Sequence, residues 1–192
     1  IMKKQRCWWC GEDPLYVTYH DEEWGVPVRD DAKLFEFLTL ETFQAGLSWI
    51  TILRKRENFR KAFDEFNYQK IATYSEAKIE QLLQDPGIIR NKLKVRATVS
   101  NAKAYLEVQK EFGSFSNYIW SFTEGVPIQN SFKSKEEVPV NTPLSDRISA
   151  DLKKRGFKFV GSTVVYAHMQ ATGMVNDHLT GCFRHSEVQK IR

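Results

Sequence analysis

Two pairs of potential metal ligands lie at opposite ends of the 192-residue sequence, and they constrain the fold more than any other feature. Cys7 and His20 lie near the start, and His178 and Cys182 lie near the end. Structural zinc takes four cysteine and histidine ligands, so one ion held by both pairs would tie the first segment of the chain to the last. The spacing of His178 and Cys182 places both on one face of a helical turn. The alternative is two buried thiols and two surface imidazoles, and spacing alone leaves it open.

The cysteine count and the charge bound the class of protein. Three cysteines is an odd number, which favours thiolates on metal in a reducing compartment over a disulfide framework. Apolar runs stay short of the roughly 18 residues of a membrane helix, and IMKKQRCWWC lacks the apolar stretch of a signal peptide, so we expect a cytoplasmic protein. The net charge of +4 says little by itself. Basic clusters at 54–56, 90–96 and 153–155 suit either a polyanion or a solvated helix face.

Helical signals run through nearly the whole sequence and predict an all-α protein. Apolar residues recur at helical spacing, and capping residues precede them. The expected helices cover 31–44, 48–63, 76–83, 91–111, a segment from Thr142-Pro143 to Gly156, and 161–173. The last of these is the weakest, because the β-branched residues of FKFVGSTVVYA also allow a strand. Residues 124–142 are polar, contain two prolines and are expected to form the one long loop.

A short turn separates two of the expected helices. In IEQLLQDPGIIRNKLKVRATV, an Asp-Pro-Gly-Ile-Ile turn follows one helix, and a basic helix begins directly after it. Such a turn can aim free backbone amides at an anion beside the N-terminus of the second helix, where the dipole and nearby lysines favour phosphate. This pattern is a helix-hairpin-helix. An ordinary αα turn that glycine permits is the alternative.

Two further stretches combine aromatic residues with one carboxylate. LETFQAGLSW places Glu41 on the apolar flank of a helix and Trp49 beyond a small-residue turn. A buried carboxylate without a partner is costly, so Glu41 either has donors around it or faces a pocket that a ligand completes. Five aromatic residues, Trp8, Trp9, Tyr16, Tyr19 and Trp24, crowd the N-terminal segment. They suit core packing, but aromatic plates beside a carboxylate are also what an extruded nucleobase requires.

These stretches together resemble the bacterial 3-methyladenine DNA glycosylase I (Tag) family. The resemblance runs in order through RCWWCGEDPLYVTYHDEEWGVP at 6–27, LETFQAGLSWITILRKRENFRKAF at 40–63, DPGIIRNKLKVRATVSNAKAYL at 85–106 and KKRGFKFVGSTVVYAHMQATGMVNDHLTGC at 153–182. It therefore covers nearly the whole chain. It implies an all-α helix-hairpin-helix DNA glycosylase in which one structural zinc ion joins the terminal segments through Cys7, His20, His178 and Cys182.

The resemblance also implies roles for individual residues. Glu41 matches the glutamate that hydrogen-bonds the damaged adenine, and Trp49 matches the tryptophan that stacks on it. Gly46 and Leu47 lie where related enzymes push into the gap left by an extruded nucleotide, as an apolar wedge should. The predicted site comprises Glu41 as the catalytic residue, Trp9, Tyr16, Tyr19 and Trp49 as base-binding residues, and Gly46, Leu47, Gly87, Ile88, Ile89, Lys92 and Lys94 as DNA-binding residues.

The implied function is excision of 3-methyladenine from double-stranded alkylated DNA by hydrolysis of the N-glycosidic bond, leaving an abasic site. Because the pocket motif contains no lysine that could form a Schiff base, we expect a monofunctional enzyme, and we expect a monomer. We predict a single globular unit over 1–192. Residues 1–30 and 157–192 would form a zinc-tied terminal lobe, and residues 31–156 a helical lobe with the hairpin at about 76–111.

Two other classes of function remain open from the sequence. A non-catalytic, zinc-stabilised DNA-binding module would need the ligand pairs and the hairpin but would have no use for Glu41 beside Trp49. A thiol oxidoreductase would use Cys7 and Cys10 as a reactive pair, whereas we interpret Cys10 as a free buried thiol. His168 is interpreted as a core residue, and His185 as solvent-exposed.

Overall fold

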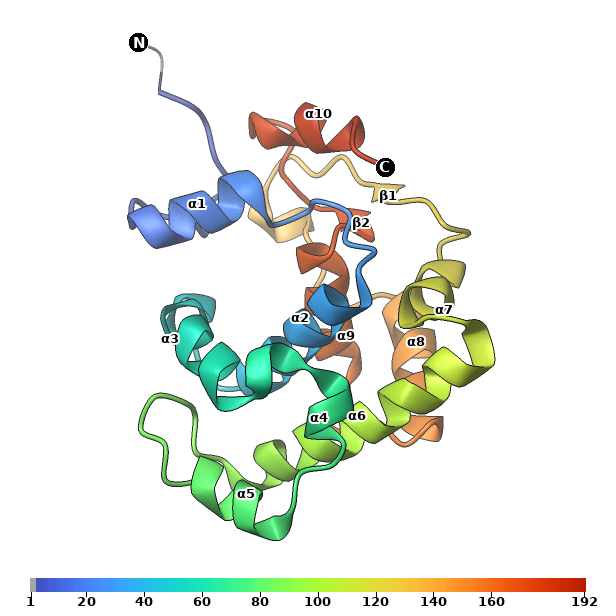
Figure 1. Cartoon of the computed structure of the whole chain (residues 1–192). Coiled ribbons are helices and arrows are strands. Elements are labelled where there is room, and N and C mark those ends of the chain that lie inside the picture. Colours follow the sequence, from blue (N-terminus) through green and yellow to red (C-terminus); the bar gives the residue numbers. More distant parts are fainter. Residues whose placement is uncertain (1–2) are drawn as a thin grey trace.

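The computed structural model describes residues 3–192, and helices dominate this range (Figure 1). The α-helices are α1 (Pro14–Glu22), α2 (Asp31–Phe43), α3 (Trp49–Ala62), α4 (Tyr68–Ile71), α5 (Glu76–Leu82), α6 (Lys92–Phe112), α7 (Phe115–Ser121), α8 (Pro143–Lys154), α9 (Ser162–Ala171) and α10 (Arg184–Gln189). Two short 3-10 helices, η1 (Asp64–Phe66) and η2 (Lys135–Glu137), and two strands, β1 (Ile128–Gln129) and β2 (Val175–Asn176), complete the described elements. None of the helices in this range is long and apolar enough to cross a membrane.

Helix α2 is the centre of the structure. Asp30 caps its N-terminus by accepting a hydrogen bond from the Lys33 amide, and every residue from 34 to 43 is buried. The helix contacts α3, α6, α7 and α9, so beyond its first turn it is enclosed on all sides (Figure 1). A helix surrounded on all sides needs an apolar circumference. Glu41, in its last turn, is therefore carried into the interior with its neighbours.

The first and last parts of the chain lie together on one side of α2. Helices α1 and α10 and both strands gather there (Figure 1). The segment that begins after α7 returns to this side, where Ile128 pairs with Val175 and Gln129 with Asn176 in a parallel register. Asn130 fastens the same segment by donating to Asp177 at 2.8 Å. The segment 124–142, predicted as one long loop, thus contains a short strand and a short 3-10 helix.

The predicted helices are confirmed with small shifts in their ends. The long helix expected at 91–111 runs from Lys92 to Phe112 and stops at Gly113, whose φ of 86° is left-handed. Thr142 forms a capping box with Ser145. The segment 161–173 is helical over Ser162–Ala171, as predicted, and not a strand. The fold class is confirmed as mostly helical, with the two-residue strand pairing as the only departure among the described residues.

The two histidines outside the metal pairs had opposite outcomes. His168 is buried, and its Nε2 lies 3.1 Å from the Leu34 carbonyl oxygen, which confirms it as a core residue. The prediction that His185 is solvent-exposed is wrong. Its ring is half-buried because its Nε2 lies 2.7 Å from the Asn130 carbonyl oxygen, against the returning loop.

Candidate active site and metal centre

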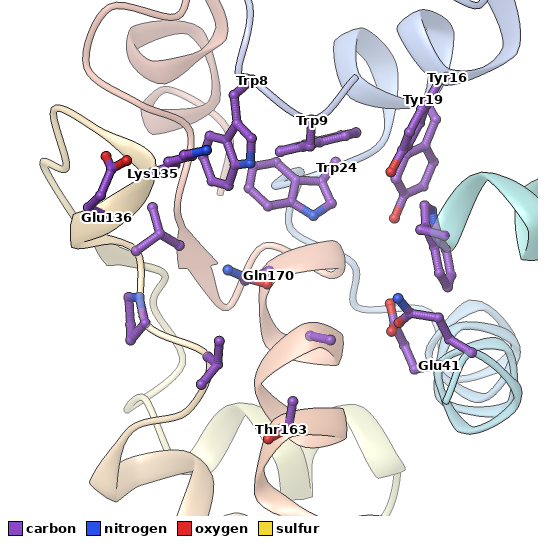
Figure 2. A pocket seen from close by; sticks show the side chains of 16 residues that line it. Trp8, Trp9, Tyr16, Tyr19, Trp24, Glu41, Lys135, Glu136, Thr163 and Gln170 are labelled. Atoms are coloured by element: carbon purple, nitrogen blue, oxygen red, sulfur yellow. The ribbon is translucent and has the colours of Figure 1, made fainter. Parts of the chain in front are cut away.

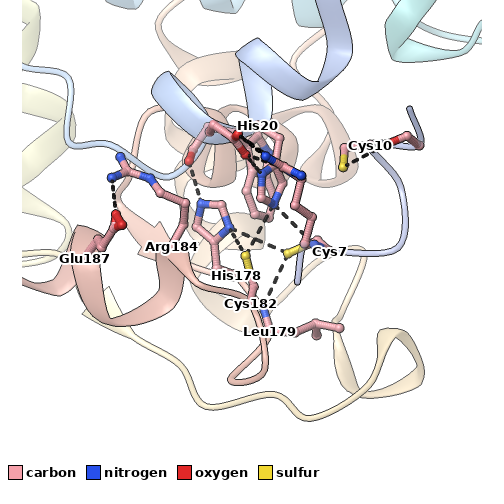
Figure 3. A network of polar contacts seen from close by, with 12 residues as sticks. Cys7, Cys10, His20, His178, Leu179, Cys182, Arg184 and Glu187 are labelled. Carbon is pink, nitrogen blue, oxygen red and sulfur yellow. Dashed lines mark hydrogen bonds and ion pairs between the residues drawn. The ribbon is translucent and has the colours of Figure 1, made fainter. Parts of the chain in front are cut away.

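Four side chains from the two ends of the chain converge on one buried point (Figure 3). They are Cys7, His20, His178 and Cys182, and their ligand atoms all lie within 4.8 Å of one another. The Cys182 Sγ lies 3.4 Å from the His20 Nε2 and 3.5 Å from the His178 Nδ1. The predicted convergence of the two ligand pairs is confirmed, and the cluster joins the N-terminal segment to the C-terminal one.

The outer contacts of this cluster suit a metal site. The His20 Nδ1 lies 2.7 Å from an Asp21 carboxylate oxygen, and Arg6 in turn holds that carboxylate at 2.8 Å. The His178 Nε2 lies 2.8 Å from the Trp24 carbonyl oxygen. Metal-binding histidines usually direct their second ring nitrogen at a carboxylate or a carbonyl, which orients the ring and fixes its tautomer. Both histidines here have that arrangement.

The two thiols are in contact, and their hydrogen bond together with burial raises the pKa of Cys7 while the pKa of Cys182 is lowered. Hydrogen bonding from the Cys7 thiol, followed by contacts with His178 and His20, lowers the pKa of Cys182. Thiolate is the form that a metal requires. Two sulfurs and two nitrogens, all buried, match the donor set of a tetrahedral structural zinc site. Cys10 lies outside this set, and its Sγ contacts the Gly11 carbonyl at 3.6 Å, in agreement with a free buried thiol.

A cavity of about 580 Å³ lies beside the metal cluster (Figure 2). A volume of this size is typical of a small-molecule site. All five residues predicted for base recognition and catalysis line it, namely Trp9, Tyr16, Tyr19, Glu41 and Trp49. They come from α1, α2, α3 and the segment before α1, so the fold gathers residues that the sequence separates.

Glu41 is the chemically distinctive group in this cavity. Its side chain is only 5% exposed, and within residues 3–192 it has no hydrogen-bonding or ionic partner. Burial raises the pKa of Glu41 to about 8. A carboxyl group without a partner, facing a cavity, is completed by a ligand that brings donors or positive charge. Of the two alternatives that the sequence left open for Glu41, surrounding donors or a pocket, the structure shows the pocket.

The raised pKa predicts that Glu41 destabilises the fold. The folded protein keeps the proton up to about pH 8, whereas the unfolded chain loses it near 4.5, so stability falls as pH rises between these values. Replacing Glu41 with Gln should increase the free energy of unfolding. We expect the gain to grow by about 3–4 kcal/mol between pH 5 and pH 8.5, measured by denaturant unfolding at both values.

A second glutamate on α2 provides the control. Glu36 is also buried, but it accepts a hydrogen bond from Arg60 at 2.5 Å. Glu36→Gln should reduce stability at both pH values, because it weakens an ion pair that exists. An equal gain in both variants would show that the effect belongs to any buried glutamate on this helix. No gain in Glu41→Gln at pH 8.5 would show that Glu41 is not held without a partner.

Aromatic rings form the wall opposite Glu41 (Figure 2). Trp9 is the hub, with ring centroids 5.0 Å from Tyr16, 6.2 Å from Tyr19 and 5.0 Å from Trp24. Trp49 reaches the same wall from α3, 5.6 Å from Tyr19. The indole Nε1 atoms of Trp9 and Trp49 are buried, and residues 3–192 offer neither of them an acceptor. These faces can hold a flat aromatic ligand against the carboxyl group.

Sequence reasoning missed the rest of the lining. The additional lining residues are Trp8, Trp24, Gln44, Lys135, Glu136, Val138, Pro139, Val140, Thr163, Ala167 and Gln170. The aromatic crowding at 8–24 was a usable signal for Trp8 and Trp24. Thr163, Ala167 and Gln170 lie at helical spacing on α9, so one face of that helix forms a side of the cavity. For the loop residues 135–140, no local pattern marks the contact.

The predicted DNA-binding residues lie in two turns and at the start of α6. Gly46 and Leu47 are exposed between α2 and α3, with φ of 79° at Gly46, so Leu47 stands on a tight turn directly between Glu41 and Trp49. In the hairpin before α6, the Gly87 amide already donates to Asp85 at 2.8 Å. Gly87 is not left-handed. The space beside it is tight, because a Cβ there would lie 3.0 Å from the Asn58 side chain and from the Asp85 carboxylate.

The remaining hairpin groups differ in their availability. Within residues 3–192 the amides of Ile88 and Ile89 donate to no backbone carbonyl or side chain, and of the two residues Ile88 is buried and Ile89 half-buried. Lys92 is exposed and lies 3.9 Å from Glu80. Lys94 is buried, and burial lowers its pKa. Lys92 is therefore the better placed of the two lysines.

Comparison with known proteins decides the family. Residues 9–185 match the family described as methyladenine glycosylase. The chain belongs to this family. The matched range includes the whole of the cavity lining except Trp8, and three of the four residues of the metal cluster.

Individual members of the methyladenine glycosylase family agree with this assignment. The chain is 50% identical to DNA-3-methyladenine glycosylase 1 of Escherichia coli (strain K12), over 93% of this chain and 95% of that protein. A crystal structure of 3-methyladenine DNA glycosylase I superposes with a TM-score of 0.91 at 52% identity, covering 93% of this chain and 98% of the other. A variant of 3-methyladenine DNA glycosylase I in complex with 3-methyladenine superposes with a TM-score of 0.90 at 35% identity, covering 93% and 96%.

Proposed function

We propose that this protein is a DNA-3-methyladenine glycosylase that excises the methylated base from alkylated double-stranded DNA in DNA repair. The observation that carries the proposal is Glu41, a partnerless buried carboxyl group facing a cavity walled by aromatic rings. Family membership supports it, because the Escherichia coli relative carries this activity in its name and a related structure holds 3-methyladenine. The activity predicted from the sequence is thereby confirmed at the level of the family.

Recognition of the base follows from its charge. Methylation of a ring nitrogen in the nucleotide makes the adenine cationic. Aromatic faces such as those of Trp9 and Trp49 attract a cation through their quadrupoles, and an ionised Glu41 adds a charge-assisted hydrogen bond. Ordinary adenine is neutral and gains neither the charge term nor the full cation–π attraction. The pocket therefore selects the alkylated base by its charge.

The chemical step requires little acid assistance from the protein. A cationic base is already a good leaving group, so the glycosidic bond breaks with the bonding electrons leaving on the base. Water then adds to the oxocarbenium-like sugar and loses a proton, which leaves an abasic site. Lys135 lines the cavity, but Figure 2 places it across the cavity from Glu41. We propose a monofunctional enzyme without a Schiff-base step.

Extrusion of the nucleotide leaves a gap in the duplex, and the turn between α2 and α3 can fill it. Leu47 is an exposed apolar side chain beside the two residues proposed to hold the base. Inserting an apolar wedge offsets the few kcal/mol that unstacking costs. We propose that Leu47, held out by Gly46, occupies the gap while Glu41 and Trp49 hold the base.

Two helical hairpins are available for the phosphate backbone. The predicted one presents the free amides of Ile88 and Ile89, with Lys92 close behind. The second is the pair α8 and α9, which pack directly on each other. The first amides of α9 have no side-chain cap, and Thr163 in its first turn lines the cavity. We propose that α9 receives the phosphate nearest the extruded nucleotide and that the predicted hairpin contacts the backbone farther along.

Three lysines test this arrangement. Lys92 begins α6, and Lys158 lies in the turn between α8 and α9. Lys92→Ala and Lys158→Ala should each weaken binding to any DNA sequence. Each should also lower by about one the number of counterions released on binding, which is read from the salt dependence of the affinity. Lys110→Ala is the control, since Lys110 is exposed at the far end of α6 and paired with Glu107 as Lys92 is with Glu80. The measurement is DNA affinity across a salt series. An equal loss in Lys92→Ala and Lys110→Ala would argue against the predicted hairpin.

We propose zinc as the metal held by the buried Cys₂His₂ cluster. Support comes from the donor set, from its burial and from the carboxylate and carbonyl that orient the two imidazoles. When bound, the ion supplies a crosslink between the chain ends. It lies beside the cavity and not in its lining, since no cluster residue lines the cavity. Its role is structural in this proposal.

The decisive experiment is base release from alkylated double-stranded DNA by the purified protein. We expect free 3-methyladenine as the released base and an intact strand that breaks only after alkali treatment. DNA binding without base release would favour the non-catalytic DNA-binding module. Spontaneous strand cleavage would contradict the monofunctional mechanism and direct attention to Lys135. Sedimentation of the protein tests the expected monomer.

A further inference from the structure

We propose that the metal cluster positions the base pocket through Trp24, so that metal binding and base binding strengthen each other. The inference rests on the proposed function, because it takes 3-methyladenine as the ligand. Trp24 lines the cavity on one side and contacts a cluster residue on the other. It would act as a positioning residue, since it connects the cluster to the aromatic wall without a role in the reaction.

The contact between Trp24 and the cluster is made by both ring and backbone. The indole ring meets the His178 ring edge to face, with centroids 4.8 Å apart. The carbonyl oxygen of the same tryptophan accepts the hydrogen bond from the His178 Nε2 at 2.8 Å. The orientation that His178 needs in order to direct its Nδ1 at a metal is therefore set by the residue that walls the pocket. Neither group can shift without the other.

Gly25 shows how closely this fit is made. A Cβ at Gly25 would lie 3.0 Å from both the Cδ2 and the Nε2 of His178. The backbone there has a φ of 85°, which a residue with a side chain rarely adopts. The Trp24-Gly25 segment thus packs closely against the imidazole ring of His178. Close packing of this kind transmits small displacements instead of absorbing them.

A second route runs through the other histidine. The Trp9 ring lies 5.1 Å from the His20 ring and 5.0 Å from Trp24. Chain connectivity adds to the contact, because Trp9 follows Cys7 by two residues and Tyr19 directly precedes His20. Both histidines of the cluster therefore support indole rings that face the cavity. A base that presses on these rings acts on the cluster geometry, and the cluster in turn holds the rings.

Linkage makes the proposal quantitative. If metal binding raises the affinity for the base by some factor, base binding must raise the affinity for the metal by the same factor. Couplings between sites typically amount to 5–150-fold. We expect a value of at least fivefold here, because two rings of the pocket touch the two histidines directly.

The test uses protein loaded with Co²⁺ in place of zinc, and free 3-methyladenine as the probe. Saturating 3-methyladenine should raise the Co²⁺ affinity at least fivefold in competition with a chelator. It should also shift the visible d–d absorption of the bound Co²⁺, which reports the geometry of the four ligands. The spectrum is recorded on folded, metal-loaded protein, so unfolding of the metal-free form cannot imitate the shift.

Two variants separate the proposed route from a general effect. Trp24→Leu should still bind 3-methyladenine but clearly reduce both the change in Co²⁺ affinity and the spectral shift, with the contact between Trp9 and His20 carrying what remains. Trp49→Phe is the matched control, because it alters the pocket from α3 and should keep the coupling. Two outcomes would overturn this inference and leave the proposed function standing. One is a parent protein that binds the base with unchanged Co²⁺ affinity and spectrum, and the other is full coupling in Trp24→Leu. A parent that bound no 3-methyladenine would overturn the proposed function as well.

Discussion

Replacing Glu41 with Gln should reduce kcat/KM for excision of 3-methyladenine by about tenfold to a hundredfold. A hydrogen bond that involves a charged group contributes roughly 1.5–3 kcal/mol, and the amide keeps the shape of the carboxylate without its charge. Glu41→Ala should lose more, because donors on the base would then stay unpaired. The measurement is the steady-state rate of base release from alkylated DNA.

The pH dependence separates recognition from proton transfer. Because the pKa of Glu41 is raised to about 8, the ionised form that attracts a cation accumulates only as pH rises. The kcat/KM of the parent should therefore increase with pH and level off above about 8, since this parameter reports the free enzyme. The Glu41→Gln profile should lack this rise. A Glu41→Gln enzyme that was wholly inactive but bound free 3-methyladenine normally would place the carboxylate in the chemical step.

Replacing a metal ligand should lower metal content and thermal stability together. We expect His178→Ala or Cys182→Ala to lose the bound zinc and to lower Tm by roughly 10 °C, which corresponds to several kcal/mol for a domain of this size. The physical reason is that metal binding and docking of the two chain ends are one process. Elemental analysis and thermal unfolding of the same preparations provide the measurement.

Cys10 provides the control for the metal prediction. It is as buried as Cys7 but lies outside the cluster, so Cys10→Ser should keep a full complement of zinc. Loss of zinc in this variant would mean that a ligand has been assigned wrongly. Undiminished zinc in both His178→Ala and Cys182→Ala would contradict the metal site itself.

Local chemistry explains why most helices were predictable. Ser75, Asn91 and Thr142 each accept a capping hydrogen bond at the start of the helix that follows, and Gly113 ends α6 in the left-handed conformation that glycine favours. Such signals lie within a few residues of the structure they determine. The exposure of His185 was not predictable in this way. It depends on Asn130, more than fifty residues away, and no local pattern reports a contact of that kind.

The site was predictable only in part, for the same reason. Residues that carry chemistry in short motifs, such as Glu41 and Trp49, were identified from those motifs and the family resemblance, and the cavity contains them. The wall contributed by residues 135–140 depends on how the long loop returns to the C-terminal segment. In the hairpin, the sequence marked the turn at Gly87 but not the close approach of the Asn58 side chain, which comes from a distant part of the chain.

The position of the metal cluster also determines when the molecule can be completed. Cys7 and His178 are separated by 171 residues, so the cluster cannot assemble on the ribosome until the chain beyond Cys182 has emerged. During synthesis the N-terminal aromatic segment has no C-terminal partner to pack against, while the helices around α2 can already form. Contacts between residues so far apart in the chain form late, because closing a long loop costs conformational entropy. Structure that has already formed between the two residues reduces that cost. The base pocket, whose wall is that aromatic segment, is therefore among the last features to form, and an unfinished chain has no working site.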